Sequence, residues 1–188
     1  MGPIEVLWGA IIFVFGCIGL IRGFLRELGV TLSILVAMYI MSDWLENREY
    51  LDLALNLAAR YTGPVLREIL VVRTSANLLK FGIYASILII VVFISYHGQT
   101  LDFPGKPPKG TAGIALNLLA GLVNGYLITG TLWHYLDILG YPVQVFGMFK
   151  PPLTSLAETL LQFTLIRLFP PYVLLFFIFF LILARVYR

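Results

Sequence analysis

The sequence predicts an all-α membrane protein, a polytopic transmembrane helical bundle with about five membrane helices and with amphipathic helices on its outer surface. Hydrophobic residues make up 60% of its 188 residues and charged residues only 12%, and the mean hydropathy is +0.92. Five apolar stretches approach the roughly 17–25 helical residues that cross a bilayer, and charged or Pro- and Gly-rich connections separate them. The stretches are Val6–Ile21, Leu28–Leu45, Leu78–Tyr96, Thr111–Leu136 and Pro171–Tyr187.

The first stretch is predicted to be an uncleaved membrane anchor whose N-terminal end lies outside the cell. No basic residue precedes it, whereas Arg22 and Arg26 follow it. A secretory signal peptide has the opposite order, with its basic residues before the apolar segment. Alternation then places every short basic connection, and the C-terminus, in the cytoplasm, as the positive-inside rule requires. The basic residues assigned to that side are Arg22, Arg26, Lys106, Lys109, Arg185 and Arg188.

The second connection is long, and residues 46–77 are predicted to form two amphipathic helices. The first has a polar stripe that repeats every four residues, and Pro64 is well placed to begin the second. We expect both to lie on the outer membrane surface, with a docking platform over the bundle as the alternative. The polar stripe consists of Arg48, Asp52, Asn56 and Arg60.

The last apolar stretch, Pro171–Tyr187, is the weakest of the predicted spans. Pro170 and Pro171 end any helix that precedes it. About 17 residues rising ~1.5 Å each fall slightly short of the ~30 Å hydrocarbon core. A re-entrant hairpin with Leu153–Phe169 is therefore the alternative to a fifth transmembrane helix.

Small residues recur on one face of the first and fourth stretches and predict close helix packing, because glycine lets the backbones of two membrane helices approach each other. Asn117 and Asn124 share the fourth stretch, and an amide in hydrocarbon needs a hydrogen-bonding partner. These two residues are expected to join helices, with a narrow polar pathway as the functional alternative. The predicted packing positions are Gly9, Gly16 and Gly19 in the first stretch and Gly113, Gly121 and Gly125 in the fourth.

A charged motif follows the first stretch and predicts more than membrane orientation. Arg22 and Arg26 are one helical turn apart, so they share a face, and the adjacent Glu27 can neutralise part of their charge. As an anchor, the two arginines would lie near anionic lipid headgroups. A bare topology signal needs only positive charge, whereas this segment adds Phe24 and the acidic Glu27 beside Gly23. We therefore expect a cytoplasmic interaction site at this motif as well.

Composition and motifs exclude several classes of protein. The only cysteine, Cys17, leaves no intrachain disulfide and no cysteine-based metal cluster. The thirteen Lys and Arg residues are spread over several loops, which indicates membrane orientation and not nucleic-acid binding. His134 lies among interfacial aromatic residues, where a snorkelling side chain is expected and a pigment or metal ligand is the alternative. Because no HExxH, GxSxG or CxxC pattern occurs, we expect no enzyme activity and no cofactor.

Two segments carry a resemblance to a known family. The segment from Gly19 to Glu27, Gly-Leu-Ile-Arg-Gly-Phe-Leu-Arg-Glu, resembles the end of the first membrane span in the colicin V production protein family (CvpA-like proteins). The segment from Gly113 to Gly125 is similar to that family's glycine-repeat span, except that Asn117 stands where another Gly is usual and Asn124 where a basic residue is frequent.

The resemblance covers residues 1–140 as a CvpA-like membrane domain and leaves residues 141–188 as a C-terminal extension with the last membrane helix. It implies a small protein of the bacterial inner (plasma) membrane that takes part in toxin production or export, or in envelope homeostasis. It implies no catalytic residues.

Two other classes of function remain as alternatives. The chain is either an accessory structural subunit of a larger respiratory or photosynthetic membrane complex, or a small channel or carrier lined by Asn117 and Asn124. In the subunit reading, aromatic residues of the last span would meet protein or pigment, although lipid contact is the commoner case. The expected partners are the lipid bilayer and other membrane subunits or a second copy of the chain, and not nucleic acid. These aromatic residues are Phe176, Phe177, Phe179 and Phe180.

Overall fold

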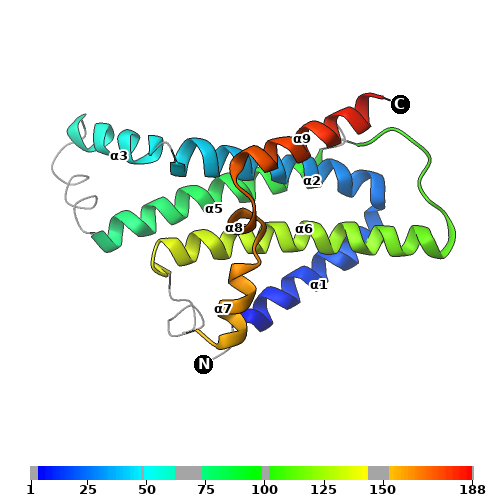
Figure 1. Ribbon diagram of the computed structural model, residues 1–188, viewed down its shortest axis with the longest axis horizontal. Coiled ribbons are helices and arrows are strands. Elements are labelled where there is room, and N and C mark those ends of the chain that lie inside the picture. Colours follow the sequence, from blue (N-terminus) through cyan, green and yellow to red (C-terminus); the bar gives the residue numbers. More distant parts are fainter. Residues whose placement is uncertain (1–3, 48, 62–72, 99–101, 144–152, 188) are drawn as a thin grey trace.

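The computed structural model describes residues 4–47, 49–61, 73–98, 102–143 and 153–187, and every regular element within them is a helix. The predicted all-α fold is therefore confirmed. Figure 1 shows the elements in sequence colours. Their order is α1 (Ile4–Arg22), α2 (Phe24–Tyr39), the π-helix η1 (Ile40–Asn47), α3 (Tyr50–Tyr61), α5 (Arg73–His97), α6 (Gly110–Ile138), α7 (Ser155–Gln162), α8 (Leu165–Leu168) and α9 (Pro171–Val186).

Four helices among the described residues are long and apolar enough to cross a membrane, and they match the first four predicted spans. They are Ile4–Arg22, Phe24–Glu46, Asn77–His97 and Gly110–Ile138.

The fifth apolar stretch forms α9, which is shorter than the other four. Its 16 residues rise only about 24 Å at ~1.5 Å per residue, less than the ~30 Å hydrocarbon core. This helix begins near the middle of the bundle and runs toward one end (Figure 1). Its aromatic side chains are largely exposed, among them Phe176 at 64% and Phe180 at 59%.

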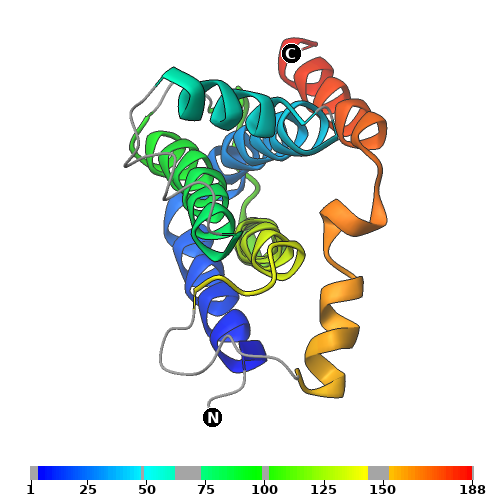
Figure 2. The ribbon, with the colours of Figure 1, turned by 90° about the vertical axis from the view of Figure 1, so that its left-hand side faces the viewer.

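The long helices lie roughly along one axis, which is horizontal in Figure 1, and alternate in direction. At one end, α1 passes into α2, α5 leads to α6 and α9 ends. Viewed along that axis in Figure 2, α6 lies in the middle of the other helices, and it contacts α1, α2, α5, α7 and α8. The buried core lies between α2, α5, α6 and α9, and includes Ile34, Met38, Leu88, Leu127 and Leu174.

A single residue, Gly23, separates α1 from α2. Its φ of +90° belongs to a region that L side chains rarely adopt, so glycine is required for the reversal. Hydrogen bonds continue across the bend, because the Gly23 N–H donates to the carbonyl of Gly19 (2.9 Å) and the N–H of Glu27 donates to the Gly23 carbonyl (3.2 Å). Two membrane helices therefore meet at a defined angle without a loop.

Four of the predicted packing glycines lie in the contact between α1 and α6. A Cβ atom added to Gly19 would lie 2.7 Å from the Cα atom of Gly121, and one added to Gly121 would lie 2.9 Å from the Cα atom of Gly19. Similarly, a Cβ on Gly125 would lie 2.9 Å from the Cα atom of Ile12, and one on Gly16 would lie 2.7 Å from the side chain of Leu122. At Gly19, Gly121 and Gly125 a larger residue would collide with the backbone of the facing helix.

Gly9 and Gly113 differ from the expectation. No atom lies within 4 Å of a Cβ on Gly9, so this residue is not a packing position. At that level the rings of Trp8 and Tyr126, with centroids 5.9 Å apart, fill the space between α1 and α6. Gly113 lies against the carbonyl group of Pro108. Its close contact is therefore with the connection before α6 and not with a second helix.

The first of the two predicted outer helices corresponds to α3. Leu51 is buried against the bundle (7% exposed), and Asp52, from the polar stripe, forms an ion pair with Lys80 of α5. The second outer helix, expected from Pro64, lies outside the described residues, as does Arg48 of the polar stripe.

Replacing Gly19 or Gly121 with Ala should lower the stability of the protein, because the new methyl group would collide with the facing backbone. Overpacking of this kind costs about 1–3 kcal/mol. Gly9→Ala is the matched control, since it adds the same group to α1 where no atom lies within 4 Å. Thermal unfolding in mild detergent measures the effect. Equal transition temperatures for all three variants would contradict the close contact between α1 and α6.

Candidate functional site

The carboxylate of Glu27 is buried among the membrane helices. Glu27 lies in the first turn of α2, and its side chain has no exposed surface. A charged group in such a place is strongly unfavourable unless it is paired and hydrogen-bonded. The partners of Glu27 are therefore the natural place to look for a functional site.

Three neighbouring helices supply those partners. The guanidinium Nη1 of Arg22, the last residue of α1, lies 3.3 Å from Oε1 of Glu27. The Tyr96 hydroxyl of α5 donates to Oε2 at 3.0 Å, and Nδ2 of Asn124 in α6 donates to the same oxygen at 2.7 Å. Asn124 Nδ2 also lies 3.0 Å from the main-chain oxygen of Glu27. Both carboxylate oxygens of Glu27 are thus occupied.

Further contacts complete this group of side chains. The Thr31 hydroxyl lies 2.7 Å from Oδ1 of Asn124 and 2.9 Å from the main-chain oxygen of Glu27. The guanidinium carbon of Arg22 lies 4.4 Å from the centroid of the Tyr96 ring, a cation–π geometry. We refer to Arg22, Glu27, Thr31, Tyr96 and Asn124 as the Glu27 cluster.

Asn117, about two turns closer to the start of α6, also bonds to α2. Its Oδ1 accepts a hydrogen bond of 2.7 Å from the main-chain N–H of Phe24, the first residue of α2. The N-cap of that helix is Gly23, which has no side chain to satisfy the free N–H groups. An amide from a different helix therefore caps α2.

These positions favour the helix-joining role of Asn117 and Asn124 over the polar pathway. Asn124 is fully buried, and both polar atoms of its amide have partners within the Glu27 cluster. Beyond the cluster, toward the other end of the bundle, lies an apolar layer whose side chains are at most 4% exposed: Ile34, Met38, Leu88 and Leu127.

The structure divides the charged motif that follows α1. Arg22 and Glu27 turn inward and pair with each other, and Gly23 forms the bend. Only Arg26 stays largely exposed, with 54% of its side chain accessible, and it lies 3.4 Å from Asp102 of the connection before α6. Of the charged residues that were expected to form a cytoplasmic interaction site, only Arg26 is therefore largely exposed at the surface.

A second charged group surrounds His134 near the opposite end of α6. His134 is buried (7% exposed). Its Nδ1 lies 3.3 Å from Nε of Arg167 and its Nε2 lies 3.7 Å from a carboxylate oxygen of Glu46. Arg167 also pairs with Asp137. An arginine N–H can only donate, so Nδ1 is the acceptor and Nε2 carries the ring proton in this geometry.

No metal centre is evident there. Within the described residues, no group of three or more His, Cys, Asp and Glu side chains could hold a metal ion. His134 instead links α6 to η1 and α8 through its two ring nitrogens.

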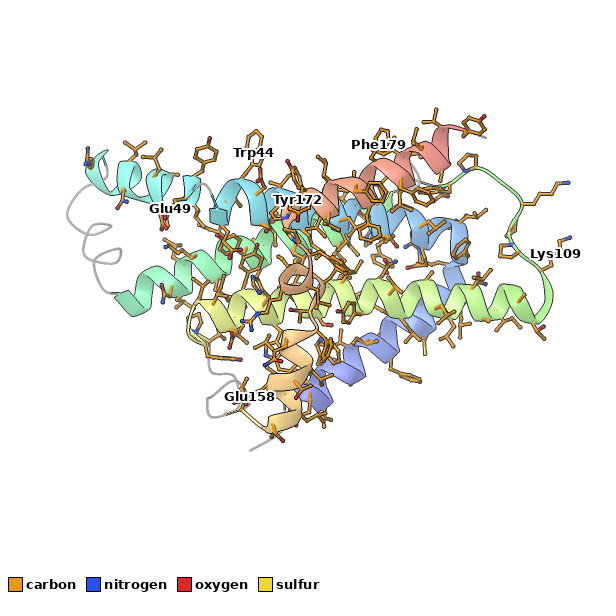
Figure 3. All side chains as sticks on the ribbon, viewed as in Figure 1. Trp44, Glu49, Lys109, Glu158, Tyr172 and Phe179 are labelled. Carbon is orange, nitrogen blue, oxygen red and sulfur yellow. The ribbon has the colours of Figure 1, made fainter. Side chains whose placement is uncertain are left out.

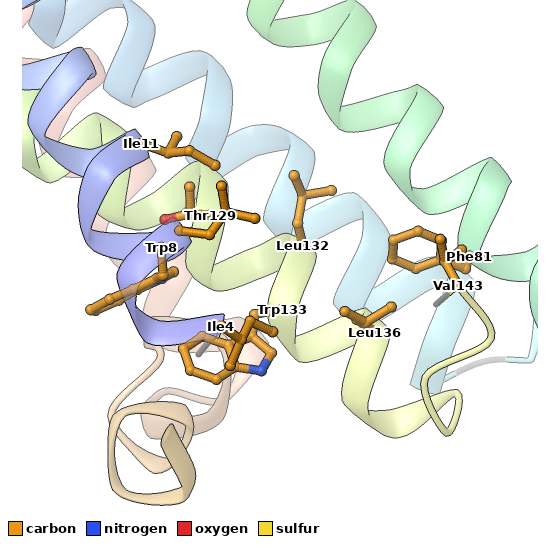
Figure 4. A pocket seen from close by; sticks show the side chains of 10 residues that line it. Ile4, Trp8, Ile11, Phe81, Thr129, Leu132, Trp133, Leu136 and Val143 are labelled. Carbon is orange, nitrogen blue, oxygen red and sulfur yellow. The ribbon is translucent and has the colours of Figure 1, made fainter. Parts of the chain in front are cut away.

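An apolar cavity of about 180 Å³ lies between α1, α6 and the start of α5 (Figure 4). Among the lining residues that the structure describes, Thr129 alone carries a hydroxyl group, and that hydroxyl donates to the carbonyl of Gly125 at 2.7 Å. Nearby, Trp133 donates from Nε1 to the Tyr141 hydroxyl at 3.3 Å, and burial raises the pKa of the Tyr141 phenol. The cavity is unsuited to a charged or strongly polar ligand. Its lining includes Ile4, Trp8, Ile11, Phe81 and Leu132.

Sequence reasoning missed Thr31, Tyr96, Glu46 and Arg167 as members of these polar groups. Thr31 stands four residues after Glu27, so the helical spacing alone places both side chains on one face of α2. Tyr96 ends an apolar stretch, so its position in the sequence predicts an interfacial aromatic residue. The residues next to it in the sequence do not indicate that the carboxylate of Glu27 lies opposite its hydroxyl group.

Comparisons with protein families, with curated proteins and with solved structures found no match to this chain. The residues of the Glu27 cluster and their contacts therefore carry the functional argument. Among them the acidic and amide oxygens are already used in contacts between helices, which is the chemistry of a structural junction.

Arg22→Leu should destabilise the protein more than Glu27→Gln does. The first change leaves a buried carboxylate without its cation, a loss of about 3–5 kcal/mol, whereas the second leaves a neutral amide that can still accept from Tyr96. Adding Glu27→Gln to Arg22→Leu should restore part of the stability. Unfolding experiments in mild detergent measure the order of stability of these variants.

Arg26→Leu is the matched control for Arg22→Leu, because it removes an exposed arginine one helical turn away. Equal losses for these two variants would mean that Arg22 does not stabilise the buried carboxylate.

Proposed function

We propose that this chain is a non-enzymatic, multi-pass protein of the bacterial inner membrane that acts, like the colicin V production family that it resembles, in toxin production or export or in envelope homeostasis. One observation carries the proposal. The two segments on which the resemblance rests, from Gly19 to Glu27 and from Gly113 to Gly125, form one structural unit.

Three contacts join these segments. Gly19 faces Gly121 at the helix crossing. The Phe24 N–H donates to Asn117 across 93 residues of sequence, and Asn124 donates to Glu27 across 97 residues. The two segments on which the resemblance rests therefore lie against each other in the folded chain and form one junction between α1, α2 and α6.

The two departures from the family pattern lie at the same junction. Asn117 and Asn124 are the two positions of the glycine span that differ from the usual residues. Each of them forms a hydrogen bond to the first segment, at Phe24 and at Glu27 respectively. The substitutions therefore fall at the contact between the two segments and provide it with polar bonds.

The finer part of the proposal is the orientation, with the N-terminus outside and the C-terminus in the cytoplasm. At one end of the bundle lie the start of α2, whose first turn contains Arg26, the connection before α6 with Lys109, and the end of α9, whose last turn contains Arg185 (Figures 1 and 3). A concentration of basic residues at one end supports a cytoplasmic position for that end. Arg188 lies outside the described residues.

Cysteine labelling in intact cells should distinguish the two ends. With Cys17 replaced by Ser, a Lys106→Cys variant should be shielded from an impermeant thiol reagent, and a Glu49→Cys variant should react. Lys106 and Glu49 are both exposed, so accessibility within the folded protein does not limit either reaction. The reverse labelling pattern would contradict the orientation.

The function itself can be tested by complementation. We expect the wild-type chain to restore toxin secretion and envelope integrity in a bacterium that lacks its own CvpA-like protein. Glu27→Leu combined with Asn124→Leu should abolish rescue, because it removes the polar contact between the two segments. Glu158→Gln, which changes an exposed carboxylate on α7, is the control and should rescue.

Immunoblots of the membrane fraction must show comparable amounts of each variant. A wild-type chain that reaches the membrane but restores neither phenotype would contradict the proposed function.

A further inference from the structure

The connection before α6 presents two lysines in a prearranged position. We propose that residues 102–109, named here the cationic loop, form a binding surface for the headgroups of anionic phospholipids, with Lys106 and Lys109 as the binding cations. The proposal goes beyond the function inferred above and does not depend on it.

The cationic loop is held at both of its ends. Near its start, the side chain of Phe103 is buried (7% exposed), and the Phe103 N–H lies 3.4 Å from the carbonyl oxygen of Leu25 in α2. Near its end, Pro108 packs on Gly113, where an added Cβ would lie 2.7 Å from the carbonyl carbon of Pro108. The loop is therefore packed against the first turns of both α2 and α6.

Three prolines restrict the cationic loop between these contacts. Pro104, Pro107 and Pro108 each fix φ near −65°. A loop that is already ordered loses less conformational entropy when it binds than a flexible one. The two lysines are consequently presented by a backbone that needs little rearrangement.

The charges of the cationic loop leave a net positive surface. Its one acidic residue, Asp102, lies 3.4 Å from Arg26 and is neutralised there. Lys106 and Lys109 are exposed, and neither forms an ion pair with any residue that the structure describes. In Figure 3 Lys109 lies at the extreme end of the molecule and points away from the bundle. Its ammonium group is free to meet an anion.

The position of the loop favours a lipid over an acidic protein. The loop leads into α6, whose 29 residues rise about 43 Å, more than the ~30 Å hydrocarbon core. The ends of α6, including the first turn that follows the loop, therefore reach the headgroup layers. Farther along α6, Leu116, Leu119 and Val123 are 37%, 55% and 46% exposed, and their spacing places them on one helix face, which provides an apolar surface for acyl chains. A phospholipid carries its anionic phosphodiester above its acyl chains. This arrangement is complementary to the two lysines, which lie above an apolar face of α6.

Native mass spectrometry of the full chain tests the proposal. The protein is purified in mild detergent with an equimolar mixture of phosphatidylglycerol and phosphatidylcholine, and the retained lipids are counted. A lysine near an anionic surface enriches the anion about fivefold, so the wild-type chain should retain phosphatidylglycerol preferentially. Lys106→Gln combined with Lys109→Gln should remove the preference, and raising the salt concentration should weaken it.

Arg60→Gln is the matched control, because it removes an exposed basic residue from α3 at the opposite end of the bundle (Figure 1). Phe103→Ala keeps both lysines but releases the start of the loop, so it should reduce the preference without removing it.

Three outcomes would overturn the proposal. They are equal retention of the two lipids by the wild-type chain, an unchanged preference in the double lysine variant, and an equal loss in Arg60→Gln. The first of these would point to an acidic protein segment as the partner. An unchanged preference in Phe103→Ala would show that the loop is not a prearranged surface.

Discussion

A carboxylate that is buried between membrane helices needs a partner for each of its oxygens, because the surrounding hydrocarbon supplies none. Glu27 obtains its partners from α1, α5 and α6, through Arg22, Tyr96 and Asn124. One side chain of α2 therefore fixes the rotation of three other helices about their own axes and their positions along the bundle. A shift of any of these helices by one turn, about 5.4 Å, would leave an ionised or polar group unpaired in the interior.

The Glu27 cluster depends in turn on the close crossing of α1 and α6. Gly19 and Gly121 allow the two backbones to touch. Asn117 lies four residues before Gly121 and Asn124 lies three residues after it, so all three positions share one face of α6. The approach of the helices at the glycines therefore brings both amides to α2, where one caps the helix and the other binds the carboxylate. Close packing and polar bonding act here as a single unit.

The distribution of polar groups agrees with a structural role in the membrane. The Glu27 cluster lies toward one end of the bundle and the charged group around His134 toward the other. Between them is a layer of fully apolar, buried side chains that includes Ile34, Met38 and Leu88. A route for ions or protons would have to pass between these three side chains, none of which carries a hydroxyl, amide or charged group. Two polar junctions that hold the helices together from either end are the simpler explanation of the arrangement.

The sequence by itself determined the membrane class, the positions of the four long spans and the glycines that could allow close packing, because composition and helical periodicity are local properties. It did not show that Glu27 points into the bundle with Arg22 or that Gly9 makes no helix contact. Those features depend on which helix lies opposite, and that neighbour is 93 to 97 residues away along the chain for α2 and α6. Spacing along one helix defines its faces, but only the packing of all the helices decides whether a charged face meets solvent or a partner.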